Sequence, residues 1–256
     1  MNLQSLIKTA LYRLGFSIRK IRPRRVTTSA AGSAREVPPD AGELHALLHK
    51  EDLFAGFDYQ RIPLDLHGWG SQSPAFAELI REQRPRLIIE VGTWKGGSAL
   101  EMARLLEEAS LPAAILCIDT WLGALEFWTE LDDPQRHGSL KLKHGYPSVY
   151  YQFLANVCHR GAQKRIVPFP QTSSIAGLWL RHYGIRADLI YLDGSHEEED
   201  VYEDLLRYWE VLADGGVLFG DDYSWDGVRL AVERFAREEG IGIAFLADKW
   251  VLRKKR

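Results

Sequence analysis

The strongest constraint on this chain is a regular alternation of apolar, strand-like runs with amphipathic, helix-like segments from residue 86 onward. Strands that alternate with helices in this way form a parallel sheet with both faces covered. Only a turn at Asp248 separates the last two expected strands, which indicates a closing hairpin. The sequence therefore predicts an α/β fold with a doubly wound, seven-stranded, mostly parallel sheet and a C-terminal antiparallel hairpin. The strands are expected at residues 86–91, 113–119, 165–170, 187–193, 215–221, 241–247 and 249–255.

The N-terminal end differs from the rest of the chain in charge. Residues 1–26 contain seven Lys and Arg and no Asp or Glu, whereas the whole chain has a net charge of −3. Apolar residues recur at helical spacing in this segment, which predicts a basic amphipathic helix. Such a helix packs on the protein itself, packs on another subunit of a homo-oligomer, or lies on an anionic membrane surface. The basic cluster directly after the apolar stripe favours the membrane. Residues 27–42 are small, polar and proline-bearing, so they predict a linker to a domain at 43–256.

Composition argues against several classes of protein. The two cysteines, Cys117 and Cys158, are not in a paired motif, which argues against a disulfide framework or a cysteine zinc site. No apolar run approaches the roughly 20 residues that span a bilayer. The body offers no basic groove with stacking aromatics, so nucleic acid is not an expected partner. These features indicate a cytoplasmic protein, with the N-terminal helix placing it peripherally at the inner face of the membrane.

A glycine-rich loop follows the first expected strand. That strand ends at Glu90, and "VGTWKGGSAL" leads from it into a helix. Glycines at such a point let the backbone approach a ligand closely, and a helix N-terminus offers free N–H groups. Trp94 occupies the second glycine position of a dinucleotide motif, which disfavours that ligand. The second strand ends in Asp119, and an acid at this place commonly binds the ribose hydroxyls of a nucleoside, with a loop or capping carboxylate as the alternative.

Acidic residues also end the fourth and fifth expected parallel strands. Asp193 ends one and is followed by His196, and Asp221 and Asp222 end the other. Adjacent strands bring these three carboxylates into one cleft, where like charges repel unless a cation lies between them. Oxygen ligands suit hard divalent ions such as Mg²⁺, so the pattern predicts a metal site. The structural alternative makes Asp222 a helix cap and His196 a loop residue.

These motifs together resemble class I S-adenosylmethionine-dependent methyltransferases. The similarity rests on "EVGTWKGGS", "CIDTWLG", "LIYLDGSHEEEDVYEDL", "LADGGVLFGDDYSWDGV" and the closing hairpin, over residues 75–256. Within that fold, the chain looks most like the branch of metal-dependent macrolide-sugar O-methyltransferases, and cephalosporin-hydroxylase-like proteins share the same features.

The resemblance implies a cofactor, S-adenosyl-L-methionine, and a divalent cation, Mg²⁺ or another. Asp193 and His196 would be catalytic, with His196 as general base in an Asp-x-x-His arrangement. A further metal carboxylate would be Glu126 or Glu130. The remaining implied positions are Glu90, Gly92, Thr93, Gly97, Ser98, Asp119 and Trp121 for the cofactor, with Trp121 beside the adenine, and Asp193, Asp221 and Asp222 for the metal.

The expected reaction is methylation of a hydroxyl on a sugar, a glycan precursor or another small molecule. An alcohol is a poor nucleophile at neutral pH, so a metal that stabilises the oxyanion and an imidazole that accepts the proton would both assist. A hydroxylase-like oxidoreductase is the first alternative, although the sequence lacks a two-His facial triad. A non-catalytic nucleoside-binding module is the second. Residues 121–147 form a long insertion that serves either as a substrate lid, with Trp121, Phe127, Trp128 and Tyr146 stacking on a sugar, or as ordinary packing.

Overall fold

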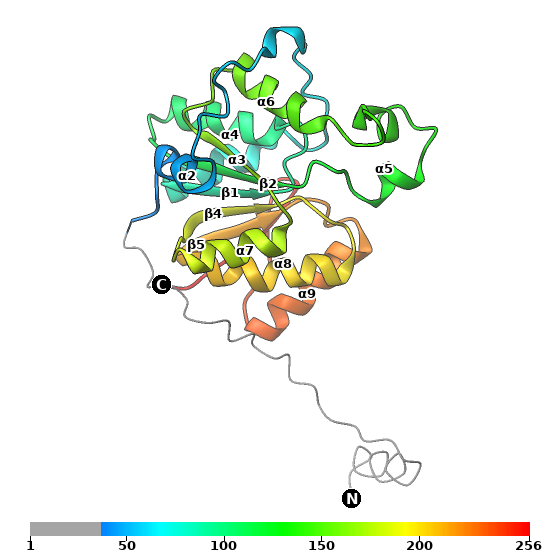
Figure 1. Cartoon of the computed structure of the whole chain (residues 1–256). Helices are drawn as coiled ribbons and strands as arrows, with labels where there is room; N and C mark the ends of the chain where they lie inside the picture. Colours follow the sequence, from blue (N-terminus) through cyan, green and yellow to red (C-terminus); the bar gives the residue numbers. More distant parts are fainter. Residues whose placement is uncertain (1–36) are drawn as a thin grey trace, which may run out of the picture. The chain divides into compact units, whose positions relative to one another are not determined.

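The computed structural model describes residues 37–256, which form the predicted α/β fold (Figure 1). The seven-stranded sheet has the order β3-β2-β1-β4-β5-β7-β6, and β7 alone runs antiparallel to its neighbours β5 and β6, while the other pairings are parallel. The strands are β1 (Leu87–Val91), β2 (Ala114–Asp119), β3 (Ile166–Pro170), β4 (Ala187–Leu192), β5 (Leu212–Gly220), β6 (Ala244–Leu246) and β7 (Lys249–Arg253). The helices are α2 (Ala41–Leu48), α3 (Pro74–Gln83), α4 (Gly97–Glu108), α5 (Leu125–Thr129), α6 (Val149–His159), α7 (Ser173–His182), α8 (Glu198–Val211) and α9 (Asp226–Glu239), with short 3₁₀ turns η1 (Tyr59–Arg61) and η2 (His137–Leu140).

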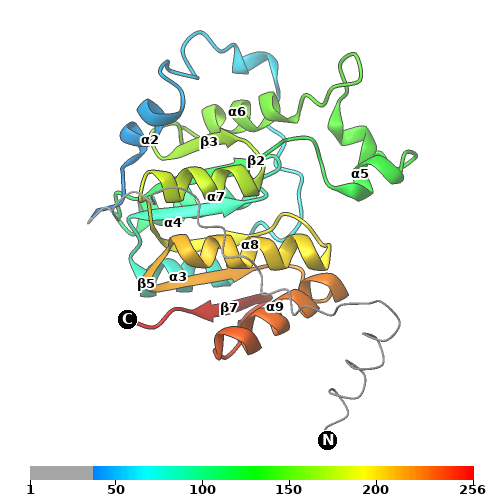
Figure 2. The same ribbon diagram turned by 60° about the horizontal axis from the view of Figure 1, so that its bottom comes forward.

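The apolar strands lie between two layers of helices (Figure 2). Every residue of β1 is buried, and successive residues point to opposite faces of the sheet. Ile88 packs in the core under α3, α4 and α6, whereas Leu87 and Ile89 pack in the core under α2, α7, α8 and α9. Burial on both faces explains why these strands read as continuous apolar runs rather than as alternating ones.

The strand order reverses between β1 and its neighbours β2 and β4, which makes the carboxyl end of β1 a topological switch point. Ligands of doubly wound sheets bind at this point. The hairpin β6–β7 adds the last two strands, and the pairing of β7 with β5 places Trp250 opposite Gly220. The residues around the turn of this hairpin therefore lie beside the end of β5.

The predicted basic helix at residues 1–26 lies outside the described residues, as does most of the predicted linker at 27–42. The last two residues of that linker already belong to α2, because Asp40 forms a capping box with Glu43 and starts the helix at Ala41. No helix within residues 37–256 has the length and apolar character needed to cross a membrane.

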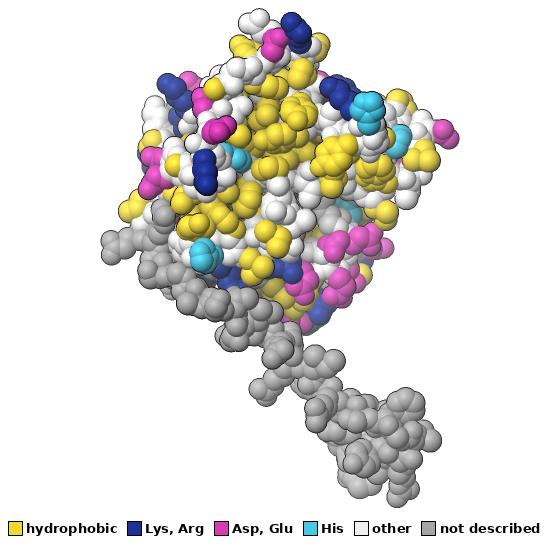
Figure 3. Space-filling view, in the orientation of Figure 1, with side chains coloured by type: hydrophobic (Ala, Val, Ile, Leu, Met, Phe, Trp, Pro, Cys, Tyr) yellow, Lys and Arg dark blue, Asp and Glu magenta, His cyan; other side chains and the backbone are white. Residues whose placement is uncertain are grey.

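The insertion at residues 121–147 contains α5 and η2, neither of which was predicted. Trp121 and Leu140 of this insertion are buried, but many of its apolar side chains stay on the surface, and Figure 3 shows hydrophobic side chains gathered over this part of the molecule. The exposed ones are Leu122, Leu125, Trp128, Leu131, Leu142 and Tyr146.

Candidate active site

One large pocket lies at the carboxyl ends of β1, β2, β4 and β5. Its volume is about 820 Å³, within the range of sites that hold drug-sized ligands. Nine of the residues listed above for the cofactor, the metal and catalysis line it, although they come from the ends of four strands and the segments that follow them. They are Gly92, Thr93, Gly97, Ser98, Asp119, Asp193, His196, Asp221 and Asp222.

The loop after β1 is held tightly against the sheet. Gly92 has a φ of +85°, and a Cβ atom there would lie 2.1 Å from the carbonyl oxygen of Asp193. The side chain of any other residue would therefore push the ends of β1 and β4 apart. The amide of Gly92 donates to the carbonyl of Ile118 at 2.9 Å, which also joins the loop to β2.

Asp119 organises the same loop from the end of β2. Its Oδ2 accepts the amides of Thr93 and Trp94 at 2.8 and 2.7 Å, and its Oδ1 accepts the amide of Trp121 at 2.7 Å. Burial raises the pKa of Asp119, and these amides oppose that shift. Asp119 is also part of the pocket wall, where a ligand hydroxyl can reach its carboxylate.

Glu90 lies below the pocket rather than in its wall. Its side chain is fully buried, and its carboxyl group accepts hydrogen bonds from Ser98 Oγ and, at 3.0 Å, from Thr93 Oγ1. Burial raises the pKa of Glu90 to about 7, and the hydroxyl donors oppose this shift. Glu90 thus supports the glycine loop from behind.

Replacing Glu90 with glutamine should flatten the dependence of stability on pH. A carboxyl group with an ordinary pKa of 4.5 and a folded-state pKa of about 7 keeps its proton in the folded state while the unfolded chain releases it. Its contribution to the free energy of unfolding is therefore present below about pH 4.5 and falls as pH rises to about 7, by about 3 kcal/mol. Urea denaturation of both proteins from pH 4.5 to 8 measures the difference. Glu78→Gln, at an exposed position on α3, is the control. Parallel curves for wild type and Glu90→Gln would contradict the prediction.

The expectation for Trp121 is wrong. The sequence places this residue beside the adenine, but its side chain is only 2% exposed and packs in the core against Tyr150 and Phe153. Its indole nitrogen donates to the carbonyl of Trp94 at 2.7 Å. The backbone at Trp121 has a φ of +54°, which turns the side chain into the core below the glycine loop. Proximity in sequence to Asp119 could not reveal this turn.

His196 stands between two carboxylates in the pocket wall. Its Nε2 lies 3.1 Å from Asp222 Oδ2 and its Nδ1 lies 3.2 Å from Glu126 Oε1, while its ring stacks on Trp225 at 4.4 Å. The hydrogen bond to Asp222, followed by that to Glu126, raises the pKa of His196 to about 9. Glu126 and Glu130 were the two candidates for a further metal carboxylate. Glu126 reaches the site, whereas Glu130 pairs with Arg136.

The three acids expected to bind a metal do converge, but each is already bonded to a protein donor. Asp193 Oδ2 accepts the Tyr191 hydroxyl at 3.0 Å, and Asp221 Oδ2 accepts Lys249 Nζ at 2.5 Å. Asp222 Oδ2 faces His196 Nε2, as described above. Burial raises the pKa of Asp193 well above its ordinary value, and the charges of Asp221 and Asp222 add to this effect.

This arrangement does not fit the expected metal site. Within residues 37–256, no group of three or more His, Cys, Asp or Glu side chains is placed to hold a metal ion. A divalent ion needs several carboxylate oxygens turned toward one point, whereas these oxygens are turned toward an ammonium, a phenol and an imidazole. The side chains of Lys249 and His196, rather than a metal ion, face the negative charges of Asp221 and Asp222.

Phe127, one of the aromatic residues expected to stack on a sugar, lies in the pocket wall, whereas several of its neighbours there were not identified from the sequence. The ring of Phe127 lies 6.1 Å from that of Trp69 and 4.5 Å from that of Trp94, measured between ring centroids. The indole nitrogen of Trp94 is buried without a hydrogen-bond partner within the described structure. Trp225 stands in the "GDDYSWDG" run but carried no recognisable spacing signal. Further wall residues are His67, Arg136, Gln171, Thr172, Ser173, Ser174 and Arg207.

Comparison with known proteins establishes the family. The family model described as "Methyltransferase domain" matches residues 89–223, which is more than half of the chain and contains the glycine loop and the acids of the site. The chain therefore belongs to the methyltransferase domain family, and the predicted resemblance is confirmed. A comparison with curated protein sequences gives no match.

Solved structures support the same fold. The O-methyltransferase from Bacillus cereus in complex with SAH is 14% identical, with a TM-score of 0.52 over 98% of this chain and 97% of that one. The O-methyltransferase TomG from Streptomyces achromogenes, in complex with SAM, is 15% identical, with a TM-score of 0.52 over 100% and 99%. CalS11, a TDP-rhamnose 3'-O-methyltransferase, is 18% identical, with a TM-score of 0.51 over 83% and 92%. At these identities the likeness establishes a class I methyltransferase fold.

Proposed function

We propose that this protein transfers a methyl group from S-adenosylmethionine to a hydroxyl of a sugar-bearing small molecule or glycan precursor. The observation that carries the proposal is the meeting, in one pocket of about 820 Å³, of the glycine loop, Asp119 and a histidine held by two carboxylates. The family match supports methyl transfer. The structural neighbours named above include SAM-bound and sugar-modifying O-methyltransferases.

The cofactor would lie on the glycine loop. Its methionine end would lie on Gly92 and Gly97, which line the pocket, and the carboxylate of Asp119 would accept a ribose hydroxyl. The first turn of α7, with Thr172, Ser173 and Ser174 in the pocket wall, offers hydroxyl groups on the far side of the same space. S-adenosylmethionine supplies an activated methyl group, so the protein's main task is to place an acceptor oxygen in line with it.

The acceptor would lie between the aromatic wall and His196. The faces of Trp69 and Phe127 suit the C–H surface of a sugar ring. A hydroxyl that replaces one carboxylate beside His196 can pass its proton to the imidazole. Asp222 or Glu126 then remains to stabilise the imidazolium that results.

Binding of S-adenosylhomocysteine tests the first half of this proposal. Calorimetry should show one site per chain, and methyl-tritiated S-adenosylmethionine should then label an acceptor from a panel of nucleotide sugars and glycosides. Failure to bind S-adenosylhomocysteine would refute the proposal. Binding without transfer to any hydroxyl acceptor would favour a nucleoside-binding module.

A membrane location is a separate part of the proposal. Residues 1–26 carry a charge of +7, which suits attraction to anionic lipid at the inner face of the membrane. Flotation with phosphatidylglycerol vesicles, for the full chain and for a chain without residues 1–26, tests it. Equal flotation of the two proteins would refute this location.

A further inference from the structure

Lys249, the first residue of β7, is buried beneath the acids of the pocket. Its side chain is 0% exposed, because β7 pairs with β5 and carries it under the end of that strand. A buried ammonium is costly unless it is paired and hydrogen-bonded. The reason why a charged residue occupies this place lies in its partners.

All three N–H donors of the ammonium are used. Nζ lies 2.5 Å from Asp221 Oδ2, 2.7 Å from Asp248 Oδ2 and 3.4 Å from the carbonyl oxygen of Gly70. Ser73 in turn holds the second oxygen of Asp248. A lysine has three donors and no acceptor, so this set of partners leaves none of its donors unused.

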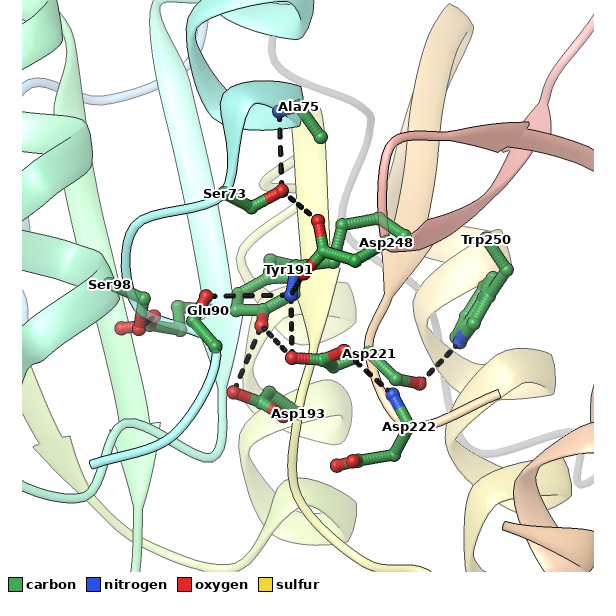
Figure 4. A network of polar contacts seen from close by, with 12 residues as sticks. Ser73, Ala75, Glu90, Ser98, Tyr191, Asp193, Asp221, Asp222, Asp248 and Trp250 are labelled. Atoms are coloured by element: carbon green, nitrogen blue, oxygen red, sulfur yellow. Dashed lines mark hydrogen bonds and ion pairs between the residues drawn. The ribbon is translucent and has the colours of Figure 1, made fainter. Parts of the chain in front are cut away.

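The ammonium also reaches Asp193 through a neighbour. The Tyr191 hydroxyl donates to Asp193 Oδ2 at 3.0 Å and lies 3.5 Å from Asp221 Oδ2, so it links the two acids. Figure 4 shows the Tyr191 hydroxyl between Asp193 and Asp221. Asp193, Tyr191, Asp221 and Lys249 form one connected network, which we name the acid–lysine network.

This network takes up the carboxylate of Asp221, which a divalent ion at this place would need. The second oxygen of Asp221 accepts the amide of Asp222 at 2.8 Å, so both oxygens of Asp221 are bonded to the protein. An ion placed among these acids would also meet the positive charge of Lys249 at close range. Like charges destabilise each other most where water is scarce.

We propose that Lys249 is the resident cation of this site and takes the place of a divalent metal. Lys249 is thereby a positioning residue: it holds Asp221, and through Tyr191 it holds Asp193, at the pocket floor. The role of these acids in methyl transfer rests on the proposed function above, whereas the site's indifference to metal does not.

The test is binding of Mn²⁺ alone to the full chain, measured from the electron paramagnetic resonance signal of free Mn²⁺ after dialysis against chelator. For wild type, the Kd of the pocket for Mn²⁺ should be above about 1 mM, which is weak binding. Lys249→Met leaves the acids without their cation, so it should bind Mn²⁺ at least tenfold more tightly, and Asp221→Asn added to it should remove that binding. Lys254→Met is the matched control, because Lys254 bonds the backbone carbonyls of Trp209 and Leu212; it should behave as wild type.

Tight Mn²⁺ binding by wild type that Asp221→Asn abolishes would overturn the proposal, and so would a Lys249→Met protein that folds and gains no affinity. The wild-type titration decides the question even if Lys249→Met does not fold, and Asp221→Asn with Lys249→Met then removes both charges together and should restore folding. Where an acceptor is found, chelator should change wild-type kcat and KM less than twofold. A protein that ignores Mn²⁺ but also fails to bind S-adenosylhomocysteine would refute the proposed function and leave the role of Lys249 intact.

Discussion

Replacing His196 with asparagine should lower the turnover number of methyl transfer by roughly 10²–10⁴-fold, the contribution typical of a positioned acid–base group. The amide of asparagine can still donate a hydrogen bond to a neighbouring carboxylate but cannot take up a proton. Affinity for S-adenosylhomocysteine should stay within twofold, because His196 lies on the acceptor side of the pocket. Initial rates with the acceptor found in the labelling screen, together with calorimetry, measure the two effects. His182→Asn, at an exposed site on α7, is the control and should leave both unchanged.

The pH profile should report the same residue. A base must be neutral to accept a proton, and the carboxylate partners raise the pKa of His196 to about 9. Wild-type kcat/KM should therefore rise with pH up to about 9 and level off above it. Glu126→Gln removes one of the two carboxylates, so the midpoint of the rise should move to lower pH. A flat profile, or a His196→Asn protein with near wild-type turnover, would exclude His196 as the base.

Replacing Gly92 with alanine should be the most damaging small change in the glycine loop. The added Cβ would meet the carbonyl oxygen of Asp193 at 2.1 Å, at a φ of +85°. The conformational strain costs about 1–2 kcal/mol and the overpacking about 1–3 kcal/mol more, and the displaced loop should lose at least tenfold in affinity for S-adenosylhomocysteine. Urea denaturation and calorimetry measure these losses.

Gly145→Ala separates strain from collision. Gly145 has a φ of +82°, but no atom lies within 4 Å of the place that a Cβ would take. This variant should therefore show the strain cost alone and keep its affinity for the cofactor product. Equal losses of stability in the two variants would mean that the contact between Gly92 and Asp193 contributes nothing.

The sheet and most of the pocket were predictable, because both depend on local patterns. Strands that are buried on both faces appear as apolar runs in the sequence. Parallel strands bring their carboxyl ends to one edge of the sheet, so Asp119, Asp193 and Asp221 could be placed at that edge from the sequence alone. The order of the elements along the chain then sufficed to indicate the fold.

The errors concern side-chain direction and long-range pairing. Trp121 turns into the core because its own backbone adopts a positive φ, which no residue type there signals. Lys249 was identified only as part of a terminal strand, and its approach to Asp221 depends on the pairing of β7 with β5. A lysine in a strand usually lies on the surface, so its burial as a counter-charge had no sequence signal. The metal expectation counted three acids and could not include Lys249 for the same reason.

The polar floor of the pocket joins segments that are far apart along the chain. Ser73 meets Asp248 across 175 residues, and Lys249 meets the carbonyl of Gly70 across 179. These contacts tie the segment just before α3 to the C-terminal hairpin, so the floor is complete only when both segments are packed on the sheet. Damage to either end of the domain would therefore be expected to disturb the pocket as well as the edge of the sheet.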